Sequence, residues 1–239
     1  MKKILFLFLY LGNETATSEE ISFRTSHCLK EIEYLDKLID RYNVFDKKYL
    51  VAVAPTKCDS FIDNVCATYK LDLYKNTVER NNTYEYPAFM AMSHESKCTP
   101  DAAFFYAHCK GTGNPTNVSF GIFKLHTSQL LCVNVDKIFS DNKINTIGLF
   151  PSQHAASWHN FFWVKTNYFK DKSILKWDNR YEFEHAVDDR SDPDHYKTCY
   201  SPLRFMDHGT NFKVMDWYTS DDIDPQSTFY DLFHLSPDL

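Results

Sequence analysis

A histidine and a lysine follow an apolar run near the middle of the chain and could bind an anion there. Six uncharged residues, 102–107, come before His108 and Lys110, and Gly111 begins a glycine-containing turn. The apolar run predicts a buried strand, and the glycines predict the loop that leaves it. Ligands of open α/β sheets bind at the carboxyl ends of strands, so a diphosphate would suit this position. A polar strand end with a solvated lysine is the alternative.

An aromatic segment at 158–165 is the second group with chemical potential. Its rings include Trp158, Phe161 and Trp163. Aromatic side chains can stack on a sugar ring, and they also fill protein cores. The segment therefore indicates either a sugar contact or part of the core.

The composition limits the classes of function. The 239 residues include 20 Phe, 15 Tyr and only 6 Gly, and the net charge is −6. This is a globular composition, and its acidic balance argues against a general nucleic-acid binder, which needs a basic surface. We expect one domain spanning 1–239, with small, locally bound anions as partners.

The cysteines and the start of the chain bear on its location. Seven cysteines without a C-x-x-C pair predict free thiols rather than disulfides or zinc. The first residues imitate a signal peptide, but the apolar run 4–11 fits a central strand equally well. It is far shorter than the ~20 residues that span a membrane. We expect a cytoplasmic protein without a transmembrane segment.

Strand and helix patterns alternate in the first part of the chain. Strands are predicted at 4–11, 49–54, 71–74 and 102–107, and helices at 18–43 and 61–69. This order predicts an α/β fold with a mainly parallel sheet flanked by helices and joined by right-handed connections.

The second part is less regular. We predict one long helix at 118–140, a strand at 144–150 and a short helix with its connection at 168–177. After Lys213 there are six Asp and no Lys or Arg, which indicates an acidic arm on the surface. Residues 1–112 would form the nucleotide-binding half and 113–239 the acceptor side.

Several segments together resemble GT-A-like glycosyltransferases of bacterial surface-polysaccharide loci and large algal viruses. The pattern is Phe-Tyr-x-His-x-Lys-Gly, Asn-Phe-x-Trp and Arg-x-x-x-Glu, found here at 105–111, 160–163 and 180–184. A further segment at 79–85 is similar to the family's asparagine-containing turn before a helix in the donor site. The resemblance covers about 78–190.

The resemblance implies a GT-A-like, Rossmann-related fold and assigns roles to individual residues. The residues that it implies for binding the nucleotide-sugar donor are Asn82, Glu85, His108, Lys110 and Gly111. The residues that it implies for contact with the sugar or the acceptor are Trp158, Asn160, Trp163 and Arg180. Asn82 and Glu85 could instead cap the helix that follows them.

The chain also departs from the family pattern. His159 stands where the family usually has Gly, and Phe162 replaces a second Trp. The Asp-x-Asp motif that holds a divalent metal in many GT-A enzymes is missing after 102–107. A requirement for Mn²⁺ or Mg²⁺ is therefore left open.

Glu184 is the predicted catalytic base. An inverting transfer needs one group to take the proton of the acceptor hydroxyl while positive charge stabilises the departing diphosphate. Glu182 would share its face only on a strand. The alternatives, for the base or for a divalent ion, are Asp188, Asp189, Asp192 and Asp194.

These observations predict a hexosyl- or deoxyhexosyltransferase that moves a sugar from a nucleotide-sugar, by default a UDP-sugar, to a glycan or glycosylated acceptor. Polysaccharide or glycoprotein synthesis is the role that the resemblance implies. The alternatives are a sugar nucleotidyltransferase, for which a glycine-rich loop after the first strand is expected, and a non-catalytic glycan-binding module.

Overall fold

The structure is a computed structural model that describes residues 1–109, 117–149, 160–172, 174, 198–202, 205–207 and 212–214. For 117–118, 205–207 and 212–214 only the backbone is described. All statements on the structure refer to these residues.

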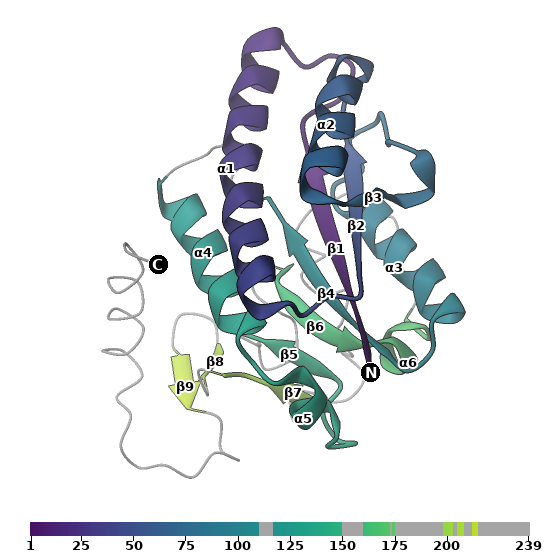
Figure 1. The fold of residues 1–239 in the computed structure, drawn as a ribbon, viewed down its shortest axis with the longest axis vertical. Helices are drawn as coiled ribbons and strands as arrows, with labels where there is room; N and C mark the ends of the chain where they lie inside the picture. The colour runs from purple at the N-terminus through teal and green to yellow at the C-terminus, as the bar shows by residue number, and fades with distance from the viewer. Residues whose placement is uncertain are drawn as a thin grey trace.

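One sheet of seven strands organises the described chain, in the order β3-β2-β1-β4-β6-β5-β7 (Figure 1). Its strands are β1 (Lys2–Tyr10), β2 (Lys47–Val53), β3 (Asp72–Leu73), β4 (Ala102–His108), β5 (Thr146–Gly148), β6 (Phe162–Lys165) and β7 (Cys199–Tyr200). β6 is antiparallel to both its neighbours, and the other pairings are parallel. The predicted α/β class with a mainly parallel sheet is confirmed.

β1 and β4 lie side by side at the centre of the sheet. They pair in parallel from Lys2 opposite Ala102 to Phe8 opposite His108. This confirms that the first apolar run and the strand before Lys110 share one sheet. From β1 the chain builds the sheet outward through β2 and β3, and it then returns to add β4 on the other side. The gap between β1 and β4 is thus the topological switch point, where open α/β sheets bind ligands beyond the carboxyl ends.

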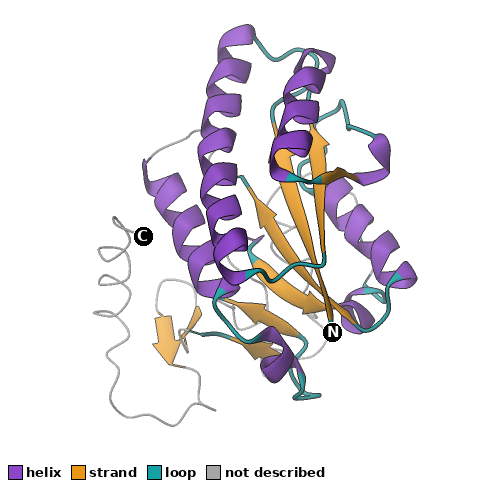
Figure 2. Cartoon of the chain, viewed as in Figure 1, coloured by secondary structure: helices purple, strands orange, loops and turns teal. Residues whose placement is uncertain are grey.

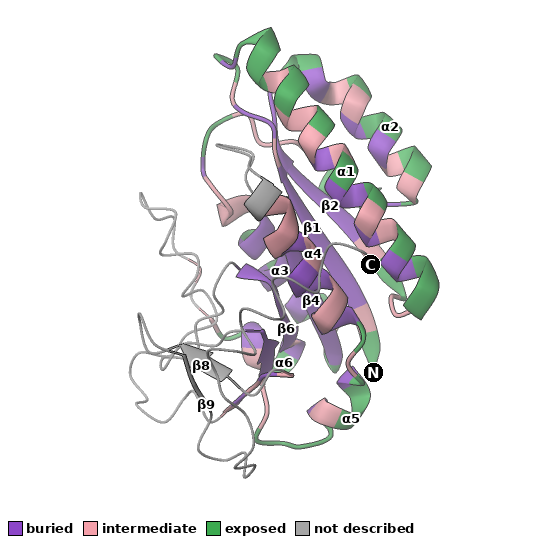
Figure 3. Cartoon of the chain, turned by 90° about the vertical axis from the view of Figure 1, so that its left-hand side faces the viewer, coloured by how far each residue is buried: buried purple, intermediate pink, exposed green. Residues whose placement is uncertain are grey.

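Helices cover both faces of the sheet (Figure 2). The helices are α1 (Ser18–Tyr42), α2 (Asp59–Tyr69), α3 (Tyr86–Cys98), α4 (Asn117–Leu131), α5 (Val135–Phe139) and α6 (Thr166–Phe169). One core cluster joins α1, α2, α4 and α5 to one face, and a second joins α3 and α6 to the other. Successive strand residues alternate between the two clusters, as Leu5 and Phe6 do. Figure 3 shows the central strands buried, with exposed residues on the outer sides of the helices.

The first helix begins and ends close to where the sequence predicts. Its N-cap is Thr17 rather than Ser18, because the Thr17 hydroxyl accepts from the Glu20 amide at 3.2 Å and Glu20 Oε2 accepts from the Thr17 amide at 2.7 Å. This reciprocal pair is a capping box. Asn43 ends the helix in the left-handed conformation, with φ of 46°.

The single helix predicted for 118–140 is wrong. The structure has α4 and α5, separated at 132–134, because Asn134 caps a new helix and its Oδ1 accepts from the Lys137 amide at 3.0 Å. In a continuous helix the Leu130 carbonyl would accept from residue 134. Here it accepts from Trp163 Nε1 at 2.8 Å instead. The end of α4 thus leaves a carbonyl free to accept a hydrogen bond from β6, and this bond links the two elements.

Other predicted elements differ in their bounds. The strand at 144–150 is shorter, as β5, and the short helix at 168–177 begins earlier, as α6. Lys47 and Lys48 begin β2, which therefore starts two residues before the predicted strand at 49–54, and Lys48 Nζ donates to the Tyr69 carbonyl at 2.7 Å. The acidic arm after Lys213 lies almost wholly outside the described residues.

All seven cysteines are free thiols. No helix in the described part of the chain is both long and apolar enough to cross a bilayer.

Candidate functional site

His108 is the last residue of β4 and lies at the centre of a polar cluster. Its side chain is on the α3 face of the sheet, as are those of the alternate β4 residues. Its ring stacks against Tyr106, with centroids 6.1 Å apart, and packs at a tilt of 34° against Phe161, with centroids 5.1 Å apart. His108 Nδ1 is 3.9 Å from Glu85 Oε1. His108 is therefore held between a carboxylate and two aromatic rings.

Glu85 joins three separate segments of the chain. Its Oε2 accepts from Asn160 Nδ2 at 2.6 Å and from the Tyr106 hydroxyl at 3.1 Å, while its Oε1 faces His108. Glu85 occupies the N-cap position of α3, but its side chain makes no capping hydrogen bond. The capping alternative therefore does not hold for this carboxylate. We call Glu85, Tyr106, His108 and Asn160 the Glu85 cluster.

Tyr106 acts as a neutral donor within the cluster. Complete burial, and then the negative charge of Glu85, raise the pKa of Tyr106 well above its ordinary value. The phenol therefore keeps its proton and donates a hydrogen bond to the carboxylate. Tyr106 belongs to the Phe-Tyr-x-His-x-Lys-Gly pattern, but no role was predicted for it, because a tyrosine in an apolar strand is expected to be a core residue.

Asn160 supplies both a donor and a buried acceptor. Its backbone is left-handed, with φ of 53°, a conformation that asparagine adopts more readily than most residues. The residue is 2% exposed, and within the described part of the chain its Oδ1 atom has no hydrogen-bond partner. A buried acceptor without a partner in a polar cluster calls for a ligand or a water molecule.

Asn82 lies in the turn that leads into the cluster. It is exposed, and its Oδ1 accepts from the Tyr84 amide at 3.3 Å, so its visible role is to shape the turn. Glu79 Oε1 accepts from the amides of Arg80 and Asn81, both at 2.9 Å. The turn 79–85 is thus ordered by its own side chains.

A bidentate ion pair fixes the same turn to the start of α2. Arg80 binds both carboxylate oxygens of Asp59, at 2.8 and 3.0 Å, and also donates to the Ala54 carbonyl at 3.1 Å. Planar guanidinium–carboxylate pairs are geometrically specific. Sequence reasoning missed Asp59 and Arg80, which are 21 residues apart and carry no local signal.

Trp163 is a core residue in this structure. It is 0% exposed, it packs against Phe105 at 5.0 Å and Phe45 at 5.4 Å, and its indole nitrogen donates to Leu130. These contacts fit the core alternative for the aromatic segment and leave no surface for a sugar. We therefore carry Trp163 no further as a sugar contact.

The remaining predicted residues lie outside the described part of the chain. These are Lys110, Gly111, Trp158, Arg180 and Glu184. Of the nine donor, sugar and acceptor candidates, the structure thus brings together Glu85, His108 and Asn160 and places Asn82 in the adjoining turn.

Helix α1 places a cation, which sequence reasoning missed, beside the loop after β1. Arg24 lies across the end of the strand: its guanidinium carbon is 5.5 Å from the Tyr10 ring centroid, and its Nη1 donates to the Leu11 carbonyl at 3.4 Å. Gly12 has φ of 111°, and a Cβ there would lie 2.6 Å from Arg24 Nη1 and 2.7 Å from Ala16 Cβ. Only glycine fits this approach.

Replacing Gly12 with alanine should therefore lower the free energy of unfolding by about 2 to 4 kcal/mol, through backbone strain and overpacking. Gly121→Ala in α4 is the matched control, because nothing lies within 4 Å of a Cβ there. The control should be neutral or stabilise by up to about 1 kcal/mol. Urea unfolding of both variants measures the difference, and equal stability would contradict the packing shown at Gly12.

Metal-binding geometry is not formed by the described residues, since no group of three His, Cys, Asp or Glu side chains within them could hold an ion. The acidic residues Asp188, Asp189, Asp192 and Asp194 lie outside them. We derive no step through a metal.

Comparisons with known proteins found no matching family model and no matching curated protein. Among solved structures, the chain is similar to mannosyl-3-phosphoglycerate synthase from Rubrobacter xylanophilus, at 10% sequence identity and a TM-score of 0.49. The match covers 84% of this chain and 64% of that one. We base no functional conclusion on a likeness this distant.

Proposed function

We propose that the protein is a glycosyltransferase that moves a sugar from a nucleotide-sugar to a glycan or glycosylated acceptor. The observation that carries this proposal is the Glu85 cluster. Residues from three motif segments, at 79–85, 105–111 and 160–163, meet through Glu85, which contacts Tyr106, His108 and Asn160. If the three segments belong to one site, their residues must lie close together in the structure, whereas segments that match by chance need not.

The position of the cluster supports a donor site. It lies at the carboxyl end of β4, beside the switch point between β1 and β4, where α/β sheets bind nucleotides. The sheet order, with one antiparallel strand among parallel ones, is compatible with a GT-A-like fold. The donor would lie against the half at 1–112, and the acceptor would approach from 113–239.

The cluster offers polar groups suited to a nucleotide-sugar. Asn160 Oδ1 is a buried acceptor for a hydroxyl, and the His108 ring can donate to an oxygen. Lys110 follows His108 by two residues in the chain and would place positive charge beside the diphosphate. In the reaction, an acceptor hydroxyl attacks the anomeric carbon, Glu184 takes its proton and the nucleoside diphosphate departs.

A ligand screen tests the class of function. We expect stabilisation of the chain against heat by one nucleoside diphosphate and its sugars, with UDP as the default, and release of that nucleotide when an acceptor is added. Binding of sugars without any nucleotide would favour a glycan-binding module. Formation of a nucleotide-sugar from a sugar phosphate and a nucleoside triphosphate would favour the nucleotidyltransferase.

Replacing Lys110 with alanine should weaken nucleotide-sugar binding by about 10- to 100-fold, because a charge-assisted contact to phosphate contributes about 1.5 to 3 kcal/mol. Lys30→Ala, at an exposed position on α1, is the control. Calorimetric titration measures both variants. Equal affinities would show that Lys110 is an ordinary surface residue.

A further inference from the structure

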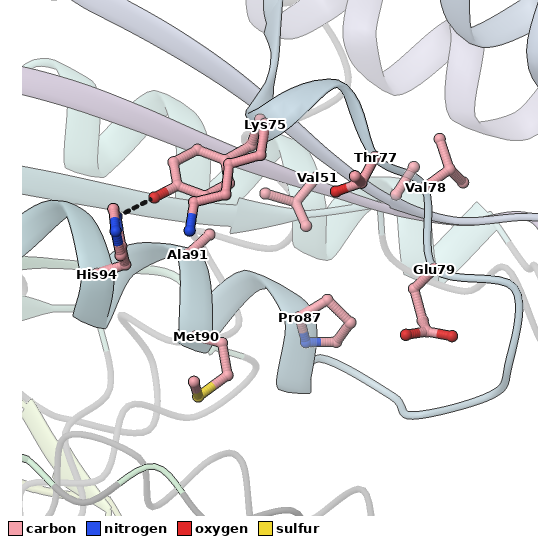
Figure 4. A pocket seen from close by; sticks show the side chains of 11 residues that line it. Val51, Lys75, Thr77, Val78, Glu79, Pro87, Met90, Ala91 and His94 are labelled. Carbon is pink, nitrogen blue, oxygen red and sulfur yellow. Dashed lines mark hydrogen bonds between the residues drawn. The ribbon is translucent and has the colours of Figure 1, made fainter.

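A second pocket lies away from the Glu85 cluster, on the α3 face of the sheet. It has a volume of about 310 Å³ and is enclosed by the end of β2, the segment that follows β3, and α3 (Figure 4). Its lining includes Val51, Lys75, Thr77, Glu79, Met90 and His94. This volume is at the small end of the range for ligand sites, about 300 to 1,000 Å³, and suits a molecule smaller than a nucleotide-sugar.

One end of the pocket is basic. Figure 4 shows Lys75 and His94 there. The Tyr74 hydroxyl is 2.9 Å from His94 Nδ1. Burial raises the pKa of Tyr74 to about 12, so the phenol keeps its proton. With Nδ1 engaged by Tyr74, Nε2 is the ring nitrogen of His94 that remains to donate to a ligand.

The backbone is strained where it presents this basic end. Lys75 has φ of 54° and Asn76 has φ of 52°, so two successive residues other than glycine are left-handed. This conformation is unfavourable for a lysine, and asparagine adopts it more readily. The Lys75 ammonium lies 5.6 Å from the Tyr74 ring centroid, on the wall of the pocket. Strain of this kind gathers at functional sites, where the surrounding structure maintains it.

The other end of the pocket is polar and acidic. Figure 4 shows Glu79 there, across the apolar surface of Pro87 and Met90 from His94. Glu79 is a carboxylate whose Oε1 is occupied by the turn 79–85, and Thr77 adds a hydroxyl. An anionic group would be repelled from Glu79 and attracted to Lys75 and His94, whereas hydroxyl groups would suit the Glu79 end.

We propose that this pocket binds the phosphate monoester of a small polyol or sugar. Its phosphate would lie between Lys75 and His94, and its hydroxyl groups would extend towards Thr77 and Glu79. A lysine binds phosphate as a point charge, and the several oxygens of a tetrahedral phosphate monoester can accept from both the ammonium and the imidazole. This site goes beyond the proposed function and does not depend on it.

The pocket and the Glu85 cluster share structural elements. Glu79 begins the turn 79–85, and Pro87, which also lines the pocket, lies two residues after Glu85 on α3. Occupation of the pocket would therefore hold the same turn and helix that position Glu85.

The test is calorimetric titration of the full chain with glucose 6-phosphate, without any nucleotide-sugar. We expect one-to-one binding that Lys75→Met weakens by about 10- to 100-fold, because the charge is lost while the apolar stem remains. Lys70→Met is the control: Lys70 is also exposed and left-handed, with φ of 52°, but it does not line the pocket. Inorganic phosphate should bind more weakly than glucose 6-phosphate with the same dependence on Lys75, and glucose should not bind.

The proposal is overturned if glucose 6-phosphate does not bind at millimolar concentration, if glucose binds equally well, or if Lys75→Met and Lys70→Met behave alike while both remain folded. His94→Gln provides a second variant, for which a several-fold loss is expected and unchanged affinity would count against the site. Binding of nucleotide-sugars is measured separately, so failure here and failure of the proposed transferase activity are distinguishable.

Discussion

Glu184→Gln should reduce the rate of sugar transfer by about 10²- to 10⁴-fold while leaving donor affinity nearly unchanged. The amide keeps the shape of the carboxylate and most of its hydrogen bonds, but it cannot take the proton from the acceptor hydroxyl. The role of Glu184 is a proposal from the Arg-x-x-x-Glu segment at 180–184. Transfer kinetics and calorimetric titration with the same nucleotide-sugar, on the same folded variant, measure the two quantities.

Glu182→Gln is the matched control, since it makes the same chemical change two residues away. It should retain most of the turnover. An equal loss in both variants, or retained turnover in the Glu184 variant, would remove the assignment. The base would then be sought among the acidic residues at 188–194.

Glu85→Ala should lower the free energy of unfolding by about 2 to 5 kcal/mol and abolish donor binding. The change removes the acceptor of two donors, the Tyr106 hydroxyl and Asn160 Nδ2. Tyr106 is 0% and Asn160 2% exposed, so neither donor gains water in exchange. A buried donor without a partner costs about 1 to 3 kcal/mol. Urea unfolding, followed by titration with the nucleotide-sugar, measures the effect.

Two variants separate the cluster from the general cost of changing α3. Glu95→Ala, on the same helix, removes the acceptor of the Thr99 hydroxyl and a side-chain interaction with Tyr49, and it should cost about 1 kcal/mol, less than Glu85→Ala. Tyr106→Phe removes one donor and should cost about 1 kcal/mol, and less in the Glu85→Ala background because the unpaired hydroxyl is then gone. Additive effects of the Glu85 and Tyr106 changes would mean that the two side chains do not act together.

If the stability of Glu85→Ala is unchanged, the carboxylate does not brace the end of β4 as the structure shows. If the variant loses stability but keeps donor affinity, the cluster is structural and the proposed donor site must lie elsewhere along the carboxyl edge.

The sequence by itself determined the elements whose patterns are local. The uninterrupted apolar runs at 4–11 and 102–107 indicated central strands, and the cap and early acids near Ser18 indicated the start of α1 within one residue. Such signals depend on neighbours along the chain, which the sequence displays directly. The motif residues Glu85, His108 and Asn160 were also visible in the sequence, although their meeting was not.

The tertiary structure decided the features that depend on distant partners. Nothing between 118 and 140 required a break, and the helix divides where Asn134 caps α5 and where Trp163 occupies the Leu130 carbonyl. From the sequence, Trp163 could be a sugar contact or a core residue, and β6 places it in the core against Phe45 and Phe105.

The same holds for the candidate sites. Glu85 is 75 residues from Asn160, and the two side chains meet because β6 pairs with β4 and α3 packs on the same face of these strands. Burial there requires each polar group to find a partner. The basic end of the second pocket likewise depends on the left-handed backbone at Lys75 and on the packing of Tyr74 against His94. Local sequence determined which residues could carry chemistry, and long-range packing decided which of them meet.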